Sequence, residues 1–167
     1  MPATKPTAKQ IQLALFNELE HGRGHRPVVP NHHFPGWFEC DVLSVTKAGF
    51  WHEFEIKLTK ADFRKDALKS TNYGTRRVPA IRTKYDALRQ GKGPSRFTYV
   101  VPDGLLKPDD VPDFAGLMVY LTRGARTYVK ELKASKQLHS RKLETKQIQS
   151  LYRLFYWRYW GLLNQTK

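Results

Sequence analysis

Two neighbouring segments of this chain have the composition of β-strands, and a short turn-forming stretch separates them. Residues 38–45 (FECDVLSV) and 50–57 (FWHEFEIK) are rich in β-branched and aromatic side chains. The intervening residues 46–49 (TKAG) include a glycine that can take a positive φ angle. The pattern predicts a β-hairpin in which Thr46 lies opposite Phe50, and this register fixes every other cross-strand pair.

The same register places two carboxylates directly opposite one another. Asp41 and Glu55 lie equally far from the turn, so their Cβ atoms are expected about 5 Å apart on one face. Lys57 projects from that face two residues further along. Two facing carboxylates favour a hard divalent cation such as Mg²⁺. The cation would polarise a phosphoryl oxygen and acidify a bound water, and the Lys57 amine would orient that water or stabilise charge on the phosphate.

The triplet Glu-x-Lys is common, so a second criterion is needed to single out one copy. The chain contains three, which begin at Glu55, Glu131 and Glu144. Glu144 falls in an expected helix, where residues i and i+2 do not share a face. Glu131 falls in a second expected hairpin, in which Ala115 would face it. Only Glu55 therefore has an opposed carboxylate, although a plain surface charge cluster would show the same spacing.

The rest of the chain alternates expected helices with expected strands. After a loose lead-in over residues 1–8, apolar residues at every fourth position predict a helix over 9–20. The other expected elements are an edge strand, a helix capped by Thr59, a short helix, a strand, a hairpin and a C-terminal helix, at residues 26–30, 59–69, 81–90, 96–101, 116–132 and 144–163. This order predicts a single α/β domain over residues 1–167, with a mixed sheet and the C-terminal helix packed on the core.

Charge and cysteine content restrict the class of partner and of site. The 167 residues include 29 Lys and Arg against 15 Asp and Glu, a net charge of +14, which predicts a polyanionic partner. One cysteine, Cys40, rules out a disulfide framework and a zinc site built on several thiolates. No stretch has the ~20 apolar residues of a membrane span, and no signal core or phosphate-loop spacing is present. The expectation is a cytoplasmic protein with no membrane partner and no nucleotide cofactor.

One part of the chain resembles a known nuclease superfamily. Residues 40–43 (CDVL), followed by residues 54–66 (FEIKLTKADFRKD), resemble the PD-(D/E)XK nucleases, and they are most similar to MmcB-like DNA-repair proteins and their phage and prophage relatives. That group shows an Asp-Val-Leu strand, then Glu-Ile-Lys, then a helix with Ser/Thr-x-x-Asp-Phe-x-x-Asp. The similarity covers about residues 9–130 and is most specific over 39–66.

The resemblance implies a restriction-endonuclease-like αβββαβ core with an extra C-terminal hairpin and helix. It implies that Asp41 and Glu55 bind Mg²⁺, for which Mn²⁺ would substitute, with the backbone carbonyl of Ile56 as a further ligand. Lys57 would be the catalytic lysine. In many members a glutamate of the first helix assists the metal, and Glu18 is the candidate here.

Two features of this sequence depart from the family pattern. Cys40 stands where a small residue is commoner, and residues 70–80 lengthen the link to the following helix. Neither of these two departures affects Asp41, Glu55 or Lys57. Glu20 is a second candidate for the glutamate of the first helix.

Basic residues gather after the predicted hairpin and are expected to contact the phosphates of DNA. They are Lys60, Arg64, Lys65, Lys69, Arg76, Arg77, Arg82 and Lys84. A solvated helix face and loop would have the same composition. The C-terminal run at residues 154–160 (LFYWRYW) is expected to pack on the sheet, with stacking on unpaired bases as the alternative.

These observations together predict a Mg²⁺-dependent deoxyribonuclease. It would act as an endonuclease that hydrolyses phosphodiester bonds in DNA repair, recombination or phage DNA metabolism, with structure-specific cutting as an attractive subtype. A homodimer would be convenient for cutting both strands. Two alternatives stay open: a non-catalytic DNA-binding accessory module with a nuclease fold, and an RNA-binding or ribosome-associated basic domain.

Overall fold

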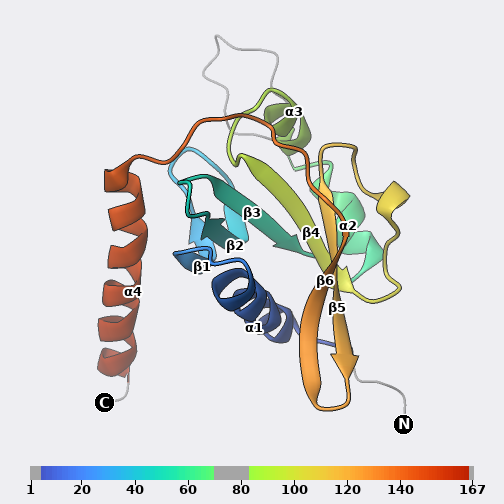
Figure 1. Ribbon diagram of the computed structural model, residues 1–167, viewed down its shortest axis with the longest axis horizontal. Coiled ribbons are helices and arrows are strands. Elements are labelled where there is room, and N and C mark those ends of the chain that lie inside the picture. Colours follow the sequence, from blue (N-terminus) through green and yellow to red (C-terminus); the bar gives the residue numbers. More distant parts are fainter. Residues whose placement is uncertain (1–4, 70–82, 166–167) are drawn as a thin grey trace.

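A six-stranded mixed sheet organises the chain (Figure 1). The computed structural model describes residues 5–69 and 83–165. The strands follow one another in the sheet in their chain order, and they are β1 Val28–His33, β2 Glu39–Val45, β3 Trp51–Ile56, β4 Arg96–Pro102, β5 Gly116–Arg123 and β6 Arg126–Lys133. The β3–β4 and β4–β5 pairs are parallel and the other three are antiparallel. A mixed α/β fold, as expected, is therefore confirmed.

The helices lie around this sheet. They are α1 Ala8–Asn17, α2 Lys60–Asp66, α3 Lys84–Arg89 and α4 Thr145–Gln165. A π-helical turn, Glu18–Gly22, continues α1, and a short 3-10 helix, Pro108–Asp110, precedes β5. The first helix begins at Ala8 because Thr7 and Gln10 form a capping box in which each side chain bonds to the other's backbone N–H.

The predicted register of the first hairpin is confirmed. Val42 pairs with Phe54 and Leu43 with Glu53, and the Thr46 N–H donates to the Phe50 carbonyl at 2.8 Å. Side chains alternate along β3, so Glu53 and Glu55 point to one side of the sheet and Phe54 to the other.

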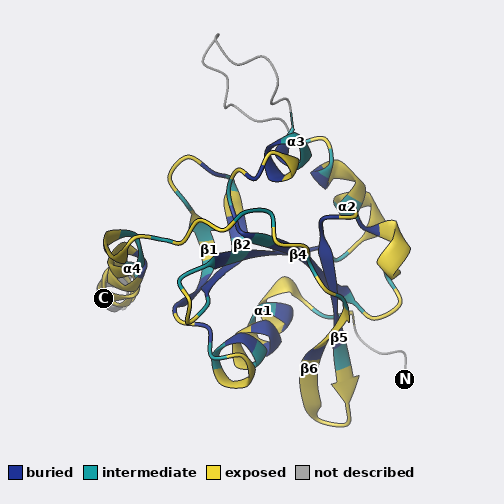
Figure 2. Cartoon of the chain, turned by 45° about the horizontal axis from the view of Figure 1, so that its top comes forward, coloured by how far each residue is buried: buried dark blue, intermediate teal, exposed yellow. Residues whose placement is uncertain are grey.

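Each face of the sheet is covered by different elements and packs against a different hydrophobic cluster (Figure 2). On one face α1 packs its apolar stripe against the even-numbered residues of β2 and β3, in a cluster that contains Ile11, Leu15, Leu19, Val42, Phe54, Ile56, Val100 and Met118. On the other face α3 and the last loops pack over a cluster that contains Leu43, Leu88, Phe97, Tyr99, Phe114, Leu117 and Leu151. Glu53 and Glu55 lie on this second face, and both are buried.

Two predictions about the C-terminal half need correction. In the second hairpin Met118 lies opposite Glu131, where Ala115 was expected, because the loop turns directly at residues 124–125. No carboxylate faces Glu131 in either register. The helix α4 packs on the core only through its first turns, at Ile148, Leu151 and Leu154, and the aromatic run that follows is exposed to solvent.

No helix in the described ranges combines the length and the apolar character needed to cross a lipid bilayer.

Gly93 offers a test of how tightly the second face is packed. Its φ angle is +74°, and a Cβ added there would meet the Trp37 ring at 2.5 Å. Gly124, at φ +60°, would meet nothing within 4 Å. Both positions carry the conformational cost of an L-residue in the left-handed region, about 1–2 kcal/mol, but only Gly93 also carries a steric clash.

We therefore expect Gly93→Ala to lower the free energy of unfolding by about 1–3 kcal/mol more than Gly124→Ala does, as overpacking typically costs. Urea unfolding followed by circular dichroism measures both. Equal losses in the two variants would show that Trp37 does not rest on Gly93.

His52, on β3, lies on the face opposite Glu53 and packs against His25 at a ring-centroid distance of 5.2 Å. Burial, with the nearby charges of His25, Arg96 and Arg23, lowers the pKa of His52 to about 3. In the unfolded chain His52 takes up a proton at about pH 6.5, whereas in the folded chain it stays neutral down to about pH 3. The stability that depends on neutral His52 is present above that pH and is lost as the pH falls toward 3.

We expect His52→Gln to remove this acid sensitivity. Between pH 7 and pH 5 the wild-type chain should lose about 1–2 kcal/mol more of its free energy of unfolding than the variant does. Chemical denaturation at a series of pH values measures the difference. His21→Gln, at an exposed position, is the control and should follow the wild type. A constant difference between wild type and His52→Gln across this range would contradict the assignment.

Candidate active site

Six charged side chains meet on the second face of the sheet, beneath α2 and α3. Three are carboxylates and three are amines, and we call them the ion cluster: Glu53, Glu55, Asp66, Lys57, Lys69 and Lys84. Strand alternation aligns the β3 members on one face, and Lys57 follows directly after the strand. Asp66 and Lys69 come from α2 and the turn after it, and Lys84 is the first residue of α3. The charges of these groups balance.

Glu55 receives an amine on each of its oxygens. Its Oε1 lies 2.8 Å from Lys57 Nζ and 2.6 Å from Lys69 Nζ, and its Oε2 lies 3.1 Å from Lys84 Nζ. Burial acts to raise the pKa of Glu55, but the three ammonium groups outweigh it and hold the pKa below its ordinary value. Glu55 is therefore a carboxylate whose negative charge is fully compensated within the chain.

Lys84 is completely buried and joins the two glutamates of β3. Its Nζ lies 2.6 Å from Glu53 and 3.1 Å from Glu55. Burial acts to lower the pKa of Lys84, but the carboxylates of the cluster raise it well above its usual value. Glu53, which also accepts a hydrogen bond from the Trp37 indole, has a raised pKa because it is buried. The prediction that Lys84 contacts DNA is wrong, since its amine is sealed inside the protein.

Asp66 closes the cluster on the side of α2. Its carboxylate lies 3.1 Å from Lys57 and 2.8 Å from Lys69, and it accepts a 2.6 Å hydrogen bond from the Tyr99 hydroxyl. Burial opposes ionisation, but the amines hold the pKa of Asp66 well below its usual range. Lys57 is thus fixed between Glu55 and Asp66, and the two carboxylates raise its pKa against the effect of burial.

Asp41 is the carboxylate that the cluster leaves uncompensated. Its Oδ2 accepts a 2.7 Å hydrogen bond from the Ile56 backbone N–H, and no described lysine or arginine forms an ion pair with it. Burial and the charge of Glu55 raise the pKa of Asp41, which shows that the two carboxylates repel one another. The predicted juxtaposition of Asp41, Glu55 and Lys57 is present.

The backbone around Asp41 is irregular. Asn31, across from it in β1, has a positive φ of 48°, which is uncommon for a residue other than glycine. Gln12 of α1 holds both strands, because its Nε2 donates to the Asn31 side chain at 2.9 Å and to the Asp41 carbonyl at 3.0 Å. The Asp41 carboxylate bonds to the backbone of β3 at this point, as a main-chain carbonyl would do in a regular ladder.

The structure does not bring Glu18 to this pair. Its carboxylate bonds to Arg23 at 3.0 Å, near the other end of β2, where His25 contacts Ser44. Glu20 pairs with Arg26. The residue of α1 that reaches the site is Gln12. The prediction was wrong because the helix passes Asp41 with its first turns and has moved away by the time it reaches residue 18.

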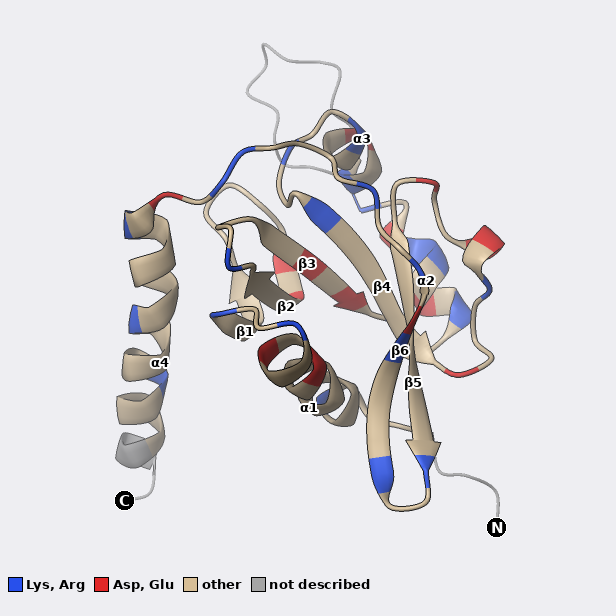
Figure 3. Ribbon diagram, in the orientation of Figure 1, with Lys and Arg blue, Asp and Glu red and all other residues tan. Residues whose placement is uncertain are grey.

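The predicted phosphate contacts fall into two further groups. Lys60, Arg64 and Lys65 are exposed on α2, next to the ion cluster. Arg76, Arg77 and Arg82 lie outside the described residues. Figure 3 shows blue and red bands along α2 and red bands on β3.

No role was predicted for Glu53, for Asp66, or for Lys69 beyond its expected contact with DNA phosphates. The signal for the latter two was the spacing after Thr59, whose side chain accepts the Asp62 N–H and starts α2 at Lys60. The helix that follows β3 must return over the sheet, so its last turn faces the strand it has just left. Among the residues that the structure describes, no three or more His, Cys, Asp or Glu side chains form a group that could hold a metal ion.

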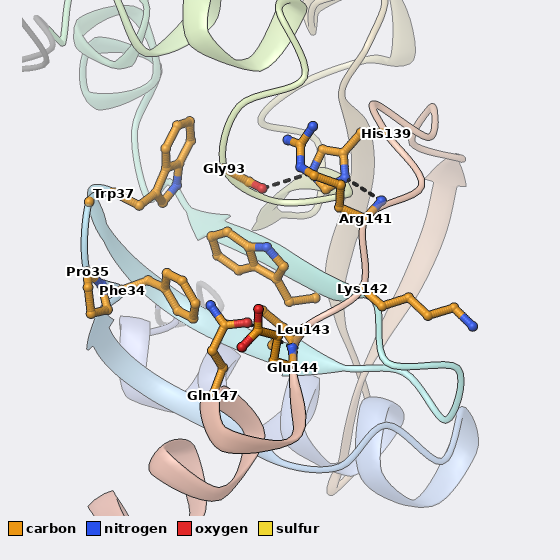
Figure 4. Close-up of a pocket in the computed structure, with 12 residues that line it drawn as sticks. Phe34, Pro35, Trp37, Gly93, His139, Arg141, Lys142, Leu143, Glu144 and Gln147 are labelled. Atoms are coloured by element: carbon orange, nitrogen blue, oxygen red, sulfur yellow. Dashed lines mark hydrogen bonds between the residues drawn. The ribbon is translucent and has the colours of Figure 1, made fainter.

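A separate cavity of about 310 Å³ lies beyond Trp37 (Figure 4). Phe34, Trp37 and Trp51 form its aromatic wall, and His139 and Gln147 contribute polar groups. Trp37 separates it from the ion cluster, since the indole that lines the cavity donates to Glu53. Asp41 and Glu55 do not line this cavity.

The comparisons with known proteins bear on the fold. No family model matches the chain, and neither does any curated protein. A protein of unknown function from Silicibacter pomeroyi, SPO1766, has a similar structure, with a TM-score of 0.54 and 17% identity over 92% of this chain and 84% of that one. At this identity the likeness shows a shared fold alone.

The ion cluster yields a stability prediction. Lys84→Met leaves Glu53 and Glu55 without their shared amine, so the free energy of unfolding should fall by about 3–5 kcal/mol. Adding Glu53→Gln should restore part of that loss, because one of the stranded charges disappears. Denaturant unfolding of the wild type, both single variants and the double variant measures the coupling.

Lys136→Met is the control, because Lys136 forms an exposed pair with Asp113. Its effect should stay below about 1 kcal/mol. Additive losses in the Glu53 and Lys84 variants would show that the two side chains do not interact.

Proposed function

We propose that this protein is a metal-dependent DNA endonuclease with a PD-(D/E)XK-type core. Asp41 and Glu55 would hold the metal, and Lys57 would act on the scissile phosphate. The observation that carries the proposal is the pair itself: two carboxylates beside each other, one of them without an amine partner in the described ranges, and a positively charged lysine next to them.

The order of the elements supports this core. A helix, three antiparallel strands, a helical crossover and a parallel fourth strand follow one another in α1, β1–β3, α2–α3 and β4. That is the αβββαβ order that the resemblance implies. The hairpin β5–β6 and helix α4 are additions after it.

The residues at Asp41 fit a Mg²⁺ ion. Mg²⁺ is commonly held by one or two carboxylates together with waters and substrate phosphates, so a closed cage of protein ligands is not needed. Asp41 and Glu55 would supply the carboxylates, and the carbonyl of Ile56 a further oxygen. The repulsion that raises the pKa of Asp41 would be relieved by a cation, and Lys69, whose side chain is 38% exposed, would have to move away from Glu55. A bound Mg²⁺, or Mn²⁺ in its place, would supply Lewis acidity toward a phosphoryl oxygen and a water.

Lys57 would work as a fixed positive charge. Its amine is held at 2.8 Å from Glu55 and 3.1 Å from Asp66, and these carboxylates raise its pKa. A lysine that stays protonated does not take a proton from water, but it donates hydrogen bonds to a phosphate that gains negative charge. The exposed Lys60, Arg64 and Lys65 would bind the DNA backbone beside it.

A second function is favoured by one observation. Both oxygens of Glu55 already bind amines, which is the arrangement expected of a DNA-binding accessory module that keeps the nuclease core without cleavage. The basic α2 would serve either function. Competition with RNA at a recorded salt concentration separates both from an RNA-binding protein.

Asp41→Asn tests the nuclease directly. Asparagine keeps an oxygen that can accept the Ile56 N–H, so the fold should be retained, while the charge that would hold the metal is lost. Cleavage of supercoiled, linear, single-stranded and branched DNA with Mg²⁺ or Mn²⁺ should fall by at least about 100-fold, the loss typical of removing one preorganised electrostatic group. DNA affinity should be equal or higher.

Asp113→Asn is the matched control, since Asp113 is exposed and pairs with Lys136. It should cut like the wild type, and EDTA should abolish cutting by both. A wild-type protein that binds DNA but cuts none of the four substrates with either metal would overturn the nuclease proposal in favour of the accessory module. From the supercoiled substrate, a nicked product would indicate that one copy acts on one strand, and a linear product that a homodimer cuts both strands.

A further inference from the structure

The helix α4 exposes a large aromatic surface. Six rings on it are 40–62% exposed, and they are Tyr152, Phe155, Tyr156, Trp157, Tyr159 and Trp160. Together they present on the order of 600 Å² of aromatic surface, at the upper end of the apolar patches on soluble monomers. Figure 1 shows α4 standing along the edge of the sheet beside β1, and Figure 2 shows it mostly exposed.

One side of α4 faces the protein and the rings cover the other. Leu151 is buried, Ile148 and Leu154 pack on the core, and Arg158 donates to the carbonyls of Pro30 and Asn31 at 2.8 and 2.9 Å. These positions recur at the helical spacing of three or four residues. The rings therefore lie on a surface that the fold itself does not use.

The charge of α4 is suited to a polyanion. Its charged residues are Lys146, Arg153 and Arg158, and residues 145–165 contain no Asp or Glu. Along the body of α4, Figure 3 shows only blue bands among tan. Aromatic side chains interleaved with basic ones are the chemistry that binds single-stranded nucleic acid, where unpaired bases stack on rings and cations contact phosphates.

The rings are available for stacking. Tyr156 and Trp157 meet edge to face at a centroid distance of 5.2 Å, and Tyr159 and Trp160 do so at 5.8 Å. In such T-shaped pairs at least one ring keeps a face uncovered by its neighbour.

A chain of contacts connects α4 to the candidate active site. Arg158 binds the Asn31 carbonyl, the Asn31 side chain binds Gln12, and Gln12 binds the Asp41 carbonyl. Only β1 separates the helix from β2, and neighbouring strands lie about 4.8 Å apart. These contacts join the protein-facing side of α4, opposite the rings, to the backbone at Asp41.

We infer that the aromatic face of α4 binds unpaired bases of single-stranded DNA and so directs the protein to DNA that contains a single-stranded segment. The inference rests on the proposed function for the identity of the nucleic acid and names the substrate class of that site. A second copy of this chain is a poorer occupant, because two molecules that each carry +14 repel one another. An anionic membrane surface remains an outcome of the test.

Tryptophan fluorescence gives a direct readout. Trp37 and Trp51 are 4% and 5% exposed, while Trp157 and Trp160 are 62% and 47% exposed, so an oligonucleotide that stacks on α4 should quench the two exposed indoles. Titration with oligo-dT in EDTA separates binding from cleavage. Replacing both exposed indoles (Trp157→Ala with Trp160→Ala) should abolish the quenching and weaken oligo-dT binding, measured by anisotropy, at least about tenfold. Binding of a blunt duplex should change little.

Tyr128→Ala is the matched control, because Tyr128 is 43% exposed on β6 and belongs to no aromatic run. It should bind oligo-dT like the wild type. Circular dichroism checks that all variants are folded.

Unchanged oligo-dT binding in the double tryptophan variant would overturn the inference and leave the nuclease proposal standing. If the double tryptophan variant loses oligo-dT binding as expected but the wild type cuts no DNA, the nuclease proposal is overturned and the inference about α4 stands. The inference is also wrong if the wild type dimerises in sedimentation and the variant does not, or if phosphatidylglycerol vesicles quench the indoles and oligo-dT does not.

Discussion

A buried amine between two buried carboxylates is the contact on which this structure depends. Strand β3 places Glu53 and Glu55 on the inner face of a sheet, where a carboxylate without a partner would be strongly disfavoured. Lys84 pairs with both, and it does so only because α3 begins over the strand. The crossover from β3 to β4 therefore supplies the charges that the middle of the sheet requires, and the fold and the cluster form together.

The same balance explains why Asp41 is distinctive. Three acids of the cluster have three amines, whereas Asp41 has a backbone N–H and the repulsion of Glu55. The negative charges of the ion cluster are therefore balanced within the protein, and Asp41 is the carboxylate beside it that a cation would neutralise. The exposed cations lie on α2 and the exposed rings on α4, which are different elements around the sheet.

Much of the fold could be predicted from the sequence. The hairpin register followed from the short turn after Val45, and it correctly placed Leu43 opposite Glu53 and Asp41 near Glu55. Such contacts are local, so alternation and turn geometry decide them. Lys84 and Glu18 were misjudged for the opposite reason. Whether a lysine is sealed in the core, or which turn of a helix passes a strand, depends on packing between distant segments.

The sequence by itself determined the order of helices and strands, the excess of positive charge and the alignment of Glu53, Glu55 and Lys57 on one face, because each depends on composition or on a period of two along a strand. Only the tertiary structure decided which charges neutralise one another and which rings stay outside. Those outcomes depend on where α2, α3 and α4 settle, and burial in a common core, rather than any local pattern, sets that position.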